Sequence, residues 1–151
     1  MTKNNLSTID HRLIHFFRRV SLPVARFGLF TVFFWFGILK ILGASPATPL
    51  VKELHSQIIP FIDFQMFYVF FAFIECLIGI LFLIKGMERI VLPLLALHMT
   101  ATFLPLFVAP GAVWQSPLVP TLEGQYIIKN LIIIAAAIGI AAHLHPLPRK
   151  K

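Results

Sequence analysis

Apolar residues form four long runs along this chain, separated by shorter segments that carry most of the polar side chains. The runs fall at about residues 24–42, 64–84, 90–109 and 125–144. A helix needs about 20 mostly apolar residues to cross a hydrocarbon core of about 30 Å. The pattern therefore predicts an all-α, polytopic membrane protein whose four spanning helices form a bundle.

The composition agrees with this prediction. Hydrophobic residues make up 58% of the 151 positions and charged residues 13%, which leaves too little polar surface for a water-soluble domain. We expect a single membrane domain over residues 1–151. Residues 1–23 precede the first run and are predicted to be a basic, amphipathic, cytoplasmic leader.

Basic residues orient the predicted spans. Ten of them lie on one side, in the N-terminal segment as far as Arg26, the turn between the second and third runs, and the tail: Lys3, Arg12, Arg18, Arg19, Arg26, Lys85, Arg89, Arg149, Lys150 and Lys151. On the opposite side of the membrane, the only basic residue that we place in a loop is Lys52. The positive-inside rule then predicts that both termini are cytoplasmic. Topology and lipid headgroups account for most of the net charge of +7, so we expect no nucleic-acid partner.

Two segments outside the runs have helical patterns. The segment from Asp10 to Val20 has one apolar and one basic face, typical of an interfacial anchor, a partner-docking helix or a leader lying on anionic lipid. Between the first two runs, we predict a helix from about Pro49 to Ile59, capped by Thr48. Its apolar residues recur every four positions, so it is expected to lie flat over the outer face.

Each run carries an ionisable group expected to be buried: Lys40, Glu75, His98 and Lys129 in chain order. A charge at the centre of a spanning helix costs about 2.5 to 3.5 kcal/mol, so such groups usually face the protein interior. We expect them to have a partner or a task.

Two glycines share helix faces with these groups. Gly37 lies three residues before Lys40, and Gly79 lies four residues after Glu75. Residues at these spacings are neighbours on a helix surface. We therefore predict close helix approach beside each charge, which places both charges inside the bundle.

Counting residues from the ends of the runs separates the groups into two layers. The outer layer holds Lys40 and Lys129, with Asp63 and Glu123 as available counter-ions. The inner layer holds Glu75, His98 and Thr102, and a gap between the layers is left for a water or ligand group. Pro105 leaves the carbonyl of Ala101 without its helical donor, so a kink near Thr102 is also predicted.

We take Glu75 and His98 as the candidate catalytic groups, because a carboxyl and an imidazole can handle protons. The candidate ligand-binding residues are Lys40, Lys129, Thr102, Glu123 and Arg26. Purely structural roles for these residues stay open as alternatives to the catalytic and ligand-binding roles. The lysines can extend to lipid headgroups, Glu75 can act as a polar lock between helices, and His98 can hydrogen-bond a carbonyl.

Other chemistry is not expected. His98 is the single deep histidine, so a haem held by two histidines has no second ligand. Cys76 is the single cysteine, which argues against a disulfide, a dithiol relay or a metal cluster. The fourth run has small residues at Ala135 and Gly139 and again at Ala137 and Ala141, a spacing that favours packing within the monomer or against a second subunit.

Three short motifs resemble those of DoxX-like membrane proteins. They are Gly37-Ile38-Leu39-Lys40, Glu75-Cys76-Leu77-Ile78-Gly79 and Lys129-Asn130-Leu131. Arg26 at the entry to the first run and the short amphipathic helix after it also fit, and the resemblance covers about residues 23–144. It implies a four-helix bundle in a bacterial inner membrane. The family takes its name from a thiosulfate:quinone oxidoreductase subunit, and related members are linked with redox stress and membrane oxidoreductase complexes.

Together these features favour an integral membrane subunit of a redox-linked system that interacts with quinone. Since the chain has no redox centre of its own, we expect no enzymatic activity from it in isolation. One alternative is a structural or assembly subunit of a larger membrane complex. A binder or conduit for a small solute or lipid is another, weakened by the absence of inverted repeats and broken helices. The expected partners are membrane lipids and either other membrane subunits or a second copy of the chain.

Overall fold

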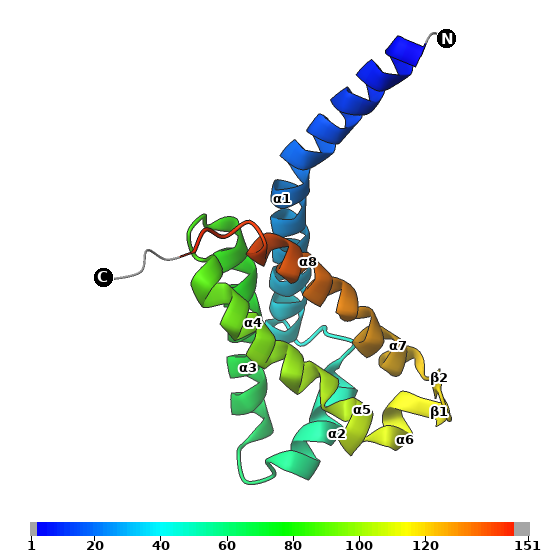
Figure 1. Ribbon diagram of the computed structural model, residues 1–151. Helices are drawn as coiled ribbons and strands as arrows, with labels where there is room; N and C mark the ends of the chain where they lie inside the picture. The colour runs from blue at the N-terminus through cyan, green and yellow to red at the C-terminus, as the bar shows by residue number, and fades with distance from the viewer. Residues whose placement is uncertain (1–2, 147–151) are drawn as a thin grey trace.

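The computed structural model describes residues 3–146, with side chains from residue 7 onward, and the chain is mostly helical (Figure 1). The predicted basic tail of Arg149, Lys150 and Lys151 lies outside the described residues. Four helical stretches are long and apolar enough to cross a membrane: Ser7–Ile41, Phe64–Leu83, Glu88–Val108 and Leu122–Ala141. These stretches match the four predicted runs.

The predicted leader and first span form one helix, α1 (Lys3–Ile41). At 1.5 Å per residue, its 39 residues extend for about 58 Å, well beyond a hydrocarbon core. Pro23 lies inside α1, where a proline removes a hydrogen bond and bends a helix. Figure 1 shows the N-terminal part of α1 projecting away from the other helices at an angle to the rest.

Helix α1 packs closely against α3 (Phe64–Leu83). A Cβ atom at Gly37 would lie 2.6 Å from Cys76 Sγ, and one at Gly79 would lie 2.8 Å from the Phe34 backbone nitrogen. Both distances are too short for a real side chain. The prediction that these two glycines permit close helix approach is therefore confirmed.

The hydrophobic core joins α1 and α3 to α4 (Glu88–Phe103) and α8 (Leu131–Ala141). Its buried members are Leu29, Phe33, Ile78, Phe82, Val91, Leu95, Met99, Ala137 and Ile140. At one end of this core, the α3–α4 turn and the end of α8 lie near the middle of α1 (Figure 1). The short elements gather at the opposite end.

The third and fourth long stretches are each divided into two helices by a single residue that keeps helical backbone angles. Helix α4 ends before Leu104, and α5 (Pro105–Val108) follows. Leu104 keeps helical backbone angles and donates to the Ala101 carbonyl at 3.3 Å, so the regular hydrogen bonding changes before Pro105, while the kink near Thr102 stays a prediction. Helix α7 (Leu122–Lys129) is separated from α8 by Asn130, which has helical backbone angles and leaves the direction almost unchanged (Figure 1).

The predicted outer helix is present as α2 (Thr48–Ile58), but Thr48 does not cap it. Its hydroxyl instead contacts the Tyr68 hydroxyl at 2.6 Å and donates to the Ser45 carbonyl at 2.8 Å. His55 is the buried residue of this helix, whereas Lys52 is exposed. The helix thus lies on the core with a histidine, rather than an aliphatic side chain, innermost.

A short hairpin that the all-α prediction did not include follows α6 (Pro110–Val113). Strands β1 (Trp114–Ser116) and β2 (Val119–Pro120) pair antiparallel. Thr121 then caps α7 by accepting from the Gly124 amide at 3.1 Å. A Cβ at Gly124 would lie 2.1 Å from the Val113 carbonyl oxygen, so glycine is required where α7 starts against the hairpin.

Candidate functional site

A buried ion pair joins α1 to α3. The Lys40 ammonium nitrogen lies 2.6 Å from Glu75 Oε2 and 2.9 Å from Oε1. The two residues are 7% and 6% exposed. Distances this short are those of strong, charge-assisted hydrogen bonds, and both partners are removed from solvent.

The predicted gap between the lysine layer and Glu75 is therefore wrong. That prediction placed the end of α1 level with the start of α3. Gly37 instead packs against Ala72 and Cys76 in the middle of α3, because the segment after α1, including α2, occupies the outermost layer. Lys40, one turn after Gly37, consequently reaches Glu75 directly.

His98 of α4 completes the cluster. Its Nε2 atom lies 3.5 Å from Glu75 Oε1, a contact longer than an ordinary hydrogen bond. The ring stacks on Phe71 with centroids 4.8 Å apart, and it meets the Phe33 ring in an edge-to-face arrangement with centroids 5.5 Å apart. His98 is 6% exposed, and its Nδ1 atom has no hydrogen-bond partner among the described residues.

Stacked rings connect this cluster to α2. The His55 ring lies 5.1 Å from the Phe67 ring, and the Phe67 ring lies 5.7 Å from that of Phe71. The Nε2 atom of His55 is also buried and without a hydrogen-bond partner in the described part of the chain. Two buried histidines thus lie at the ends of one aromatic stack, each with an unused ring nitrogen.

Sequence reasoning missed His55, although a signal was present. Phe64, Phe67 and Phe71 recur at i, i+3 and i+7, and Glu75 follows four residues later on the same face. This periodicity marks the face of α3 that leads to the carboxylate. The periodicity of α3 could not identify which residue of α2 covers the outer end of that face.

The other predicted site residues lie outside the Lys40–Glu75–His98 cluster. Lys129 and Glu123 are exposed, and the Lys129 ammonium lies 5.4 Å from the centre of the Tyr126 ring. Thr102 is half-buried one turn after His98 and donates to the His98 carbonyl at 3.0 Å. Asp63, a predicted counter-ion, instead caps α3 by accepting from the Met66 amide at 2.9 Å. A ligand-binding role for Lys129, Glu123 or Thr102 stays a prediction.

Arg26, the remaining predicted residue, belongs to a second ion pair at the other end of the core. Its guanidinium pairs with Glu88, the first residue of α4, and also donates to the Phe82 carbonyl at 3.4 Å. Glu88 was not recognised as a site residue from the sequence. The available signal was an acidic residue between Lys85 and Arg89 in an otherwise basic turn.

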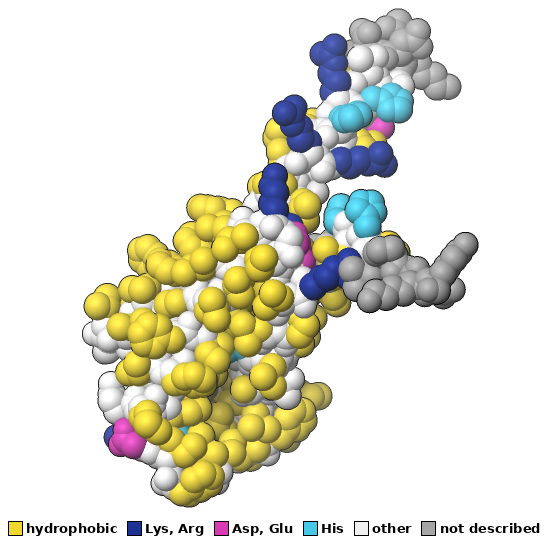
Figure 2. Space-filling view, turned by 90° about the vertical axis from the view of Figure 1, so that its left-hand side faces the viewer, with side chains coloured by type: hydrophobic (Ala, Val, Ile, Leu, Met, Phe, Trp, Pro, Cys, Tyr) yellow, Lys and Arg dark blue, Asp and Glu magenta, His cyan; other side chains and the backbone are white. Residues whose placement is uncertain are grey.

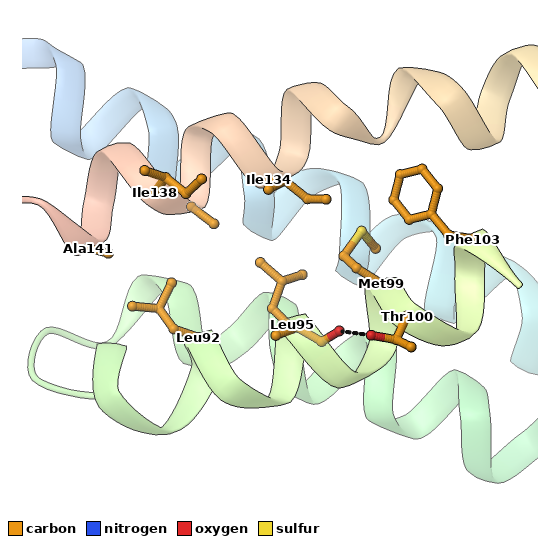
Figure 3. Close-up of a pocket in the computed structure, with 10 residues that line it drawn as sticks. Leu92, Leu95, Met99, Thr100, Phe103, Ile134, Ile138 and Ala141 are labelled. Carbon is orange, nitrogen blue, oxygen red and sulfur yellow. Dashed lines mark hydrogen bonds between the residues drawn. The ribbon is translucent and has the colours of Figure 1, made fainter.

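Two cavities lie away from the Lys40–Glu75–His98 cluster. One, of about 500 Å³, adjoins the Arg26–Glu88 pair. The other, of about 340 Å³, is an apolar groove between α4 and α8. Figure 3 shows Leu95 and Met99 of α4 pointing toward Ile134 and Ile138 of α8 across this groove.

A scan against protein-family models, a search of curated proteins and a search of solved structures each found no match to this chain. The resemblance to DoxX-like proteins therefore stays a prediction. The expectation that the chain binds neither haem nor a metal cluster also stays a prediction. The described residues contain no group of three or more His, Cys, Asp or Glu placed to hold a metal ion.

Chemically, the cluster combines a cation, a carboxylate and an imidazole in contact within an aromatic surrounding. Lys40 supplies N–H donors, Glu75 accepts them, and His98 can donate or accept at either ring nitrogen. The arrangement can therefore hold a proton at several adjacent atoms. Nδ1 of His98 remains able to hydrogen-bond one further polar atom.

Proposed function

We propose that this chain is a four-helix membrane bundle in a bacterial inner membrane, with both termini cytoplasmic. Support comes from its surface, where large apolar side chains are widely exposed, including Leu97 at 71% and Ile132 at 72%. Figure 2 shows hydrophobic side chains covering the visible face of the body, while Lys and Arg gather along the projecting part of α1 and near its base. Lipid tails would cover the hydrophobic side chains, and lipid headgroups would contact the Lys and Arg side chains.

Reporter fusions test this placement. Fusions at each end of the chain should both report a cytoplasmic location, and a fusion after Pro117 should report the opposite side. A C-terminal reporter outside the cytoplasm would contradict the four-span topology.

Within the bundle, we propose that the Lys40–Glu75–His98 cluster binds the head of a quinone-like carbonyl compound and exchanges protons with it. The observation that carries this proposal is the unpartnered Nδ1 of a His98 ring that is almost fully buried. A quinone carbonyl oxygen would accept a hydrogen bond from this nitrogen. Reduction of a quinone consumes two protons, which suits adjacent carboxyl and imidazole groups.

A purely structural role explains the cluster less well. Replacing a buried ion pair by apolar residues is often neutral or stabilising, so such a pair is weak support for a stability role. The apolar groove between α4 and α8 also favours an amphiphilic ligand. Met99 lines that groove and directly follows His98, so the groove and the cluster occupy neighbouring faces of α4.

The electrons must come from elsewhere, since the proposal gives the chain no redox centre of its own. We therefore propose that it acts as a subunit of a redox-linked membrane system. The isolated chain should bind quinone without turning it over.

Quinone binding to the purified chain tests the role of the cluster. His98→Phe keeps a stackable ring but removes both nitrogens, and it should weaken binding of a short-chain benzoquinone by at least about tenfold, as expected for one lost hydrogen bond in a buried site. His143→Phe is the matched control, because His143 is exposed. Equal binding by the wild type and a folded His98→Phe variant would contradict the proposal.

A second candidate is a structural or assembly subunit of a larger complex, favoured by one face of α8. Ala137 is buried within the chain, whereas Ala135 and Gly139 are exposed. Apart from its own helix, the described residues place no atom within 4 Å of a Cβ built at Gly139, so another helix could approach there closely. If the chain is such a subunit, Gly139→Leu should change the migration of its complex on blue-native gels. The wild-type chain should then show no quinone binding.

Binding or conduction of a small solute or lipid is a third candidate. The helical backbone angles of Leu104 and Asn130 weigh against it, because many transport sites are built on unwound helix segments. It requires a polar path from Lys129 to Glu75. Solute-dependent protection of cysteines introduced along that path would support it over the quinone role.

A further inference from the structure

The cavity beside the Arg26–Glu88 pair lies at the end of the core where three distant segments meet. These are the middle of α1, the turn between α3 and α4, and the end of α8. Its volume is about 500 Å³, enough for a polar headgroup. Four of its lining side chains are basic or imidazole, namely Arg19, Arg26, Lys85 and His143, and one is acidic, Glu88.

The charges in this cavity do not balance. Glu88 neutralises Arg26, and the side chains of this pair are 10% and 12% exposed. Arg19 and Lys85 are exposed and form no ion pair within the described part of the chain. Two uncompensated cations therefore face a concave surface, where their combined field favours an anion.

The cavity has a fixed wall rather than a loose set of side chains. Arg26 bonds both Glu88 and the Phe82 carbonyl, which links α1 to the ends of α3 and α4. Arg89 donates to the His145 carbonyl at 2.6 Å and links α4 to the segment after α8. A guanidinium has five N–H donors, so Arg26 retains donors that these contacts do not use.

The remaining lining side chains are apolar, including Leu22 of α1, Ile140 of α8 and Leu144. A site with a cationic side and an apolar side fits an amphiphile better than a free ion. With the proposed topology, this end of the bundle lies at the cytoplasmic membrane surface. Basic pockets between helices at that depth bind anionic lipid headgroups.

We propose that this cavity is a specific site for the phosphate headgroup of an anionic phospholipid, with Arg19 and Lys85 contacting the phosphate and Arg26, held by Glu88, forming the wall. The inference rests on the proposed membrane placement and is independent of the quinone role. It separates two sets of basic residues on α1. Arg19 and Arg26 line the cavity, whereas Arg12 and Arg18 lie outside it.

Native mass spectrometry of the purified full chain tests the proposal, with phosphatidylglycerol and phosphatidylcholine of identical acyl chains as probes. The wild type should bind phosphatidylglycerol more tightly. The double variant Arg19→Gln, Lys85→Gln should lose at least about tenfold in phosphatidylglycerol affinity, because each basic residue near an anionic lipid contributes to binding. Affinity for phosphatidylcholine should stay unchanged.

The matched control is the double variant Arg12→Gln, Arg18→Gln, which removes the same charge but leaves the cavity intact. Its phosphatidylglycerol affinity should change by less than about twofold. Equal losses in the two double variants would show general surface attraction and overturn the proposal. No loss in the cavity variant would overturn it as well.

A second arm separates a lipid headgroup from free phosphate. Inorganic phosphate at millimolar concentration should not displace phosphatidylglycerol from the wild type, because phosphate lacks the apolar part that contacts Leu22 and Ile140. If phosphate alone displaces the lipid, the site recognises the free anion and the lipid proposal is wrong.

Discussion

The Arg26–Glu88 and Lys40–Glu75 ion pairs differ in what surrounds them. Arg26 and Lys40 both belong to α1, and each reaches a glutamate on another helix, Glu88 on α4 and Glu75 on α3. Around Arg26, the neighbours are a backbone carbonyl and an open, basic cavity. Around Lys40, they are aromatic rings and a histidine with an unused nitrogen. The first pair links α1 to α4 beside an open cavity, whereas the second places a lysine, a carboxyl and an imidazole inside the core.

The largest expected effect comes from breaking the deeper pair. Glu75→Leu leaves the Lys40 ammonium buried without its partner and should lower the free energy of unfolding by about 3 to 5 kcal/mol. Glu88→Leu should cost about 1.5 to 3 kcal/mol, because Arg26 keeps its backbone partner and lies near solvent. Denaturant unfolding of both variants in detergent measures the difference. A larger loss of unfolding free energy for Glu88→Leu than for Glu75→Leu would contradict the deeper burial of the Lys40–Glu75 pair.

A smaller effect is expected where α1 meets α3. Gly37→Ala puts a methyl group 2.6 Å from Cys76 Sγ, and such overpacking costs about 1 to 3 kcal/mol. Gly28→Ala, on the same helix but with no atom within 4 Å of the new Cβ, should be neutral or stabilise by up to about 1 kcal/mol. Thermal unfolding of the two variants gives the comparison. Equal melting temperatures would mean that α1 and α3 are not held this closely.

The smallest effect is expected at Lys129. This side chain is exposed and lies over Tyr126, away from both pairs. Lys129→Gln should change stability by less than about 0.5 kcal/mol. Its benzoquinone affinity should stay within about twofold of the wild type, a difference of about 0.4 kcal/mol. A strong loss of benzoquinone binding would instead support the sequence prediction that Lys129 binds the ligand.

Much of the fold could be predicted from local patterns. The four apolar runs, the amphipathic helix α2 and the changed hydrogen bonding before Pro105 each depend on residues close together in the sequence. The close approach at Gly37 and Gly79 was also predictable, because a glycine on the same helix face as a buried charge leaves room there for a neighbouring backbone. These features require no knowledge of how distant segments align.

The candidate site depends on such alignment, and there the sequence was less informative. Glu75 and His98 were identified as deep groups, and the structure brings them within contact of each other. Their pairing with Lys40 was missed because the depth of the end of α1 depends on how the segment containing α2 folds over it. Arg26 and Glu88 lie 62 residues apart, and no local pattern connects them.

We propose that the Lys40–Glu75–His98 cluster serves a ligand rather than stability, and the double variant Lys40→Met, Glu75→Leu separates these two roles. Because it removes both charges together, its free energy of unfolding should stay within about 1.5 kcal/mol of the wild type. In the same samples, benzoquinone binding should fall by at least about tenfold. A double variant that unfolds as readily as Glu75→Leu alone, or that binds benzoquinone as tightly as the wild type, would contradict the ligand-binding role of this cluster.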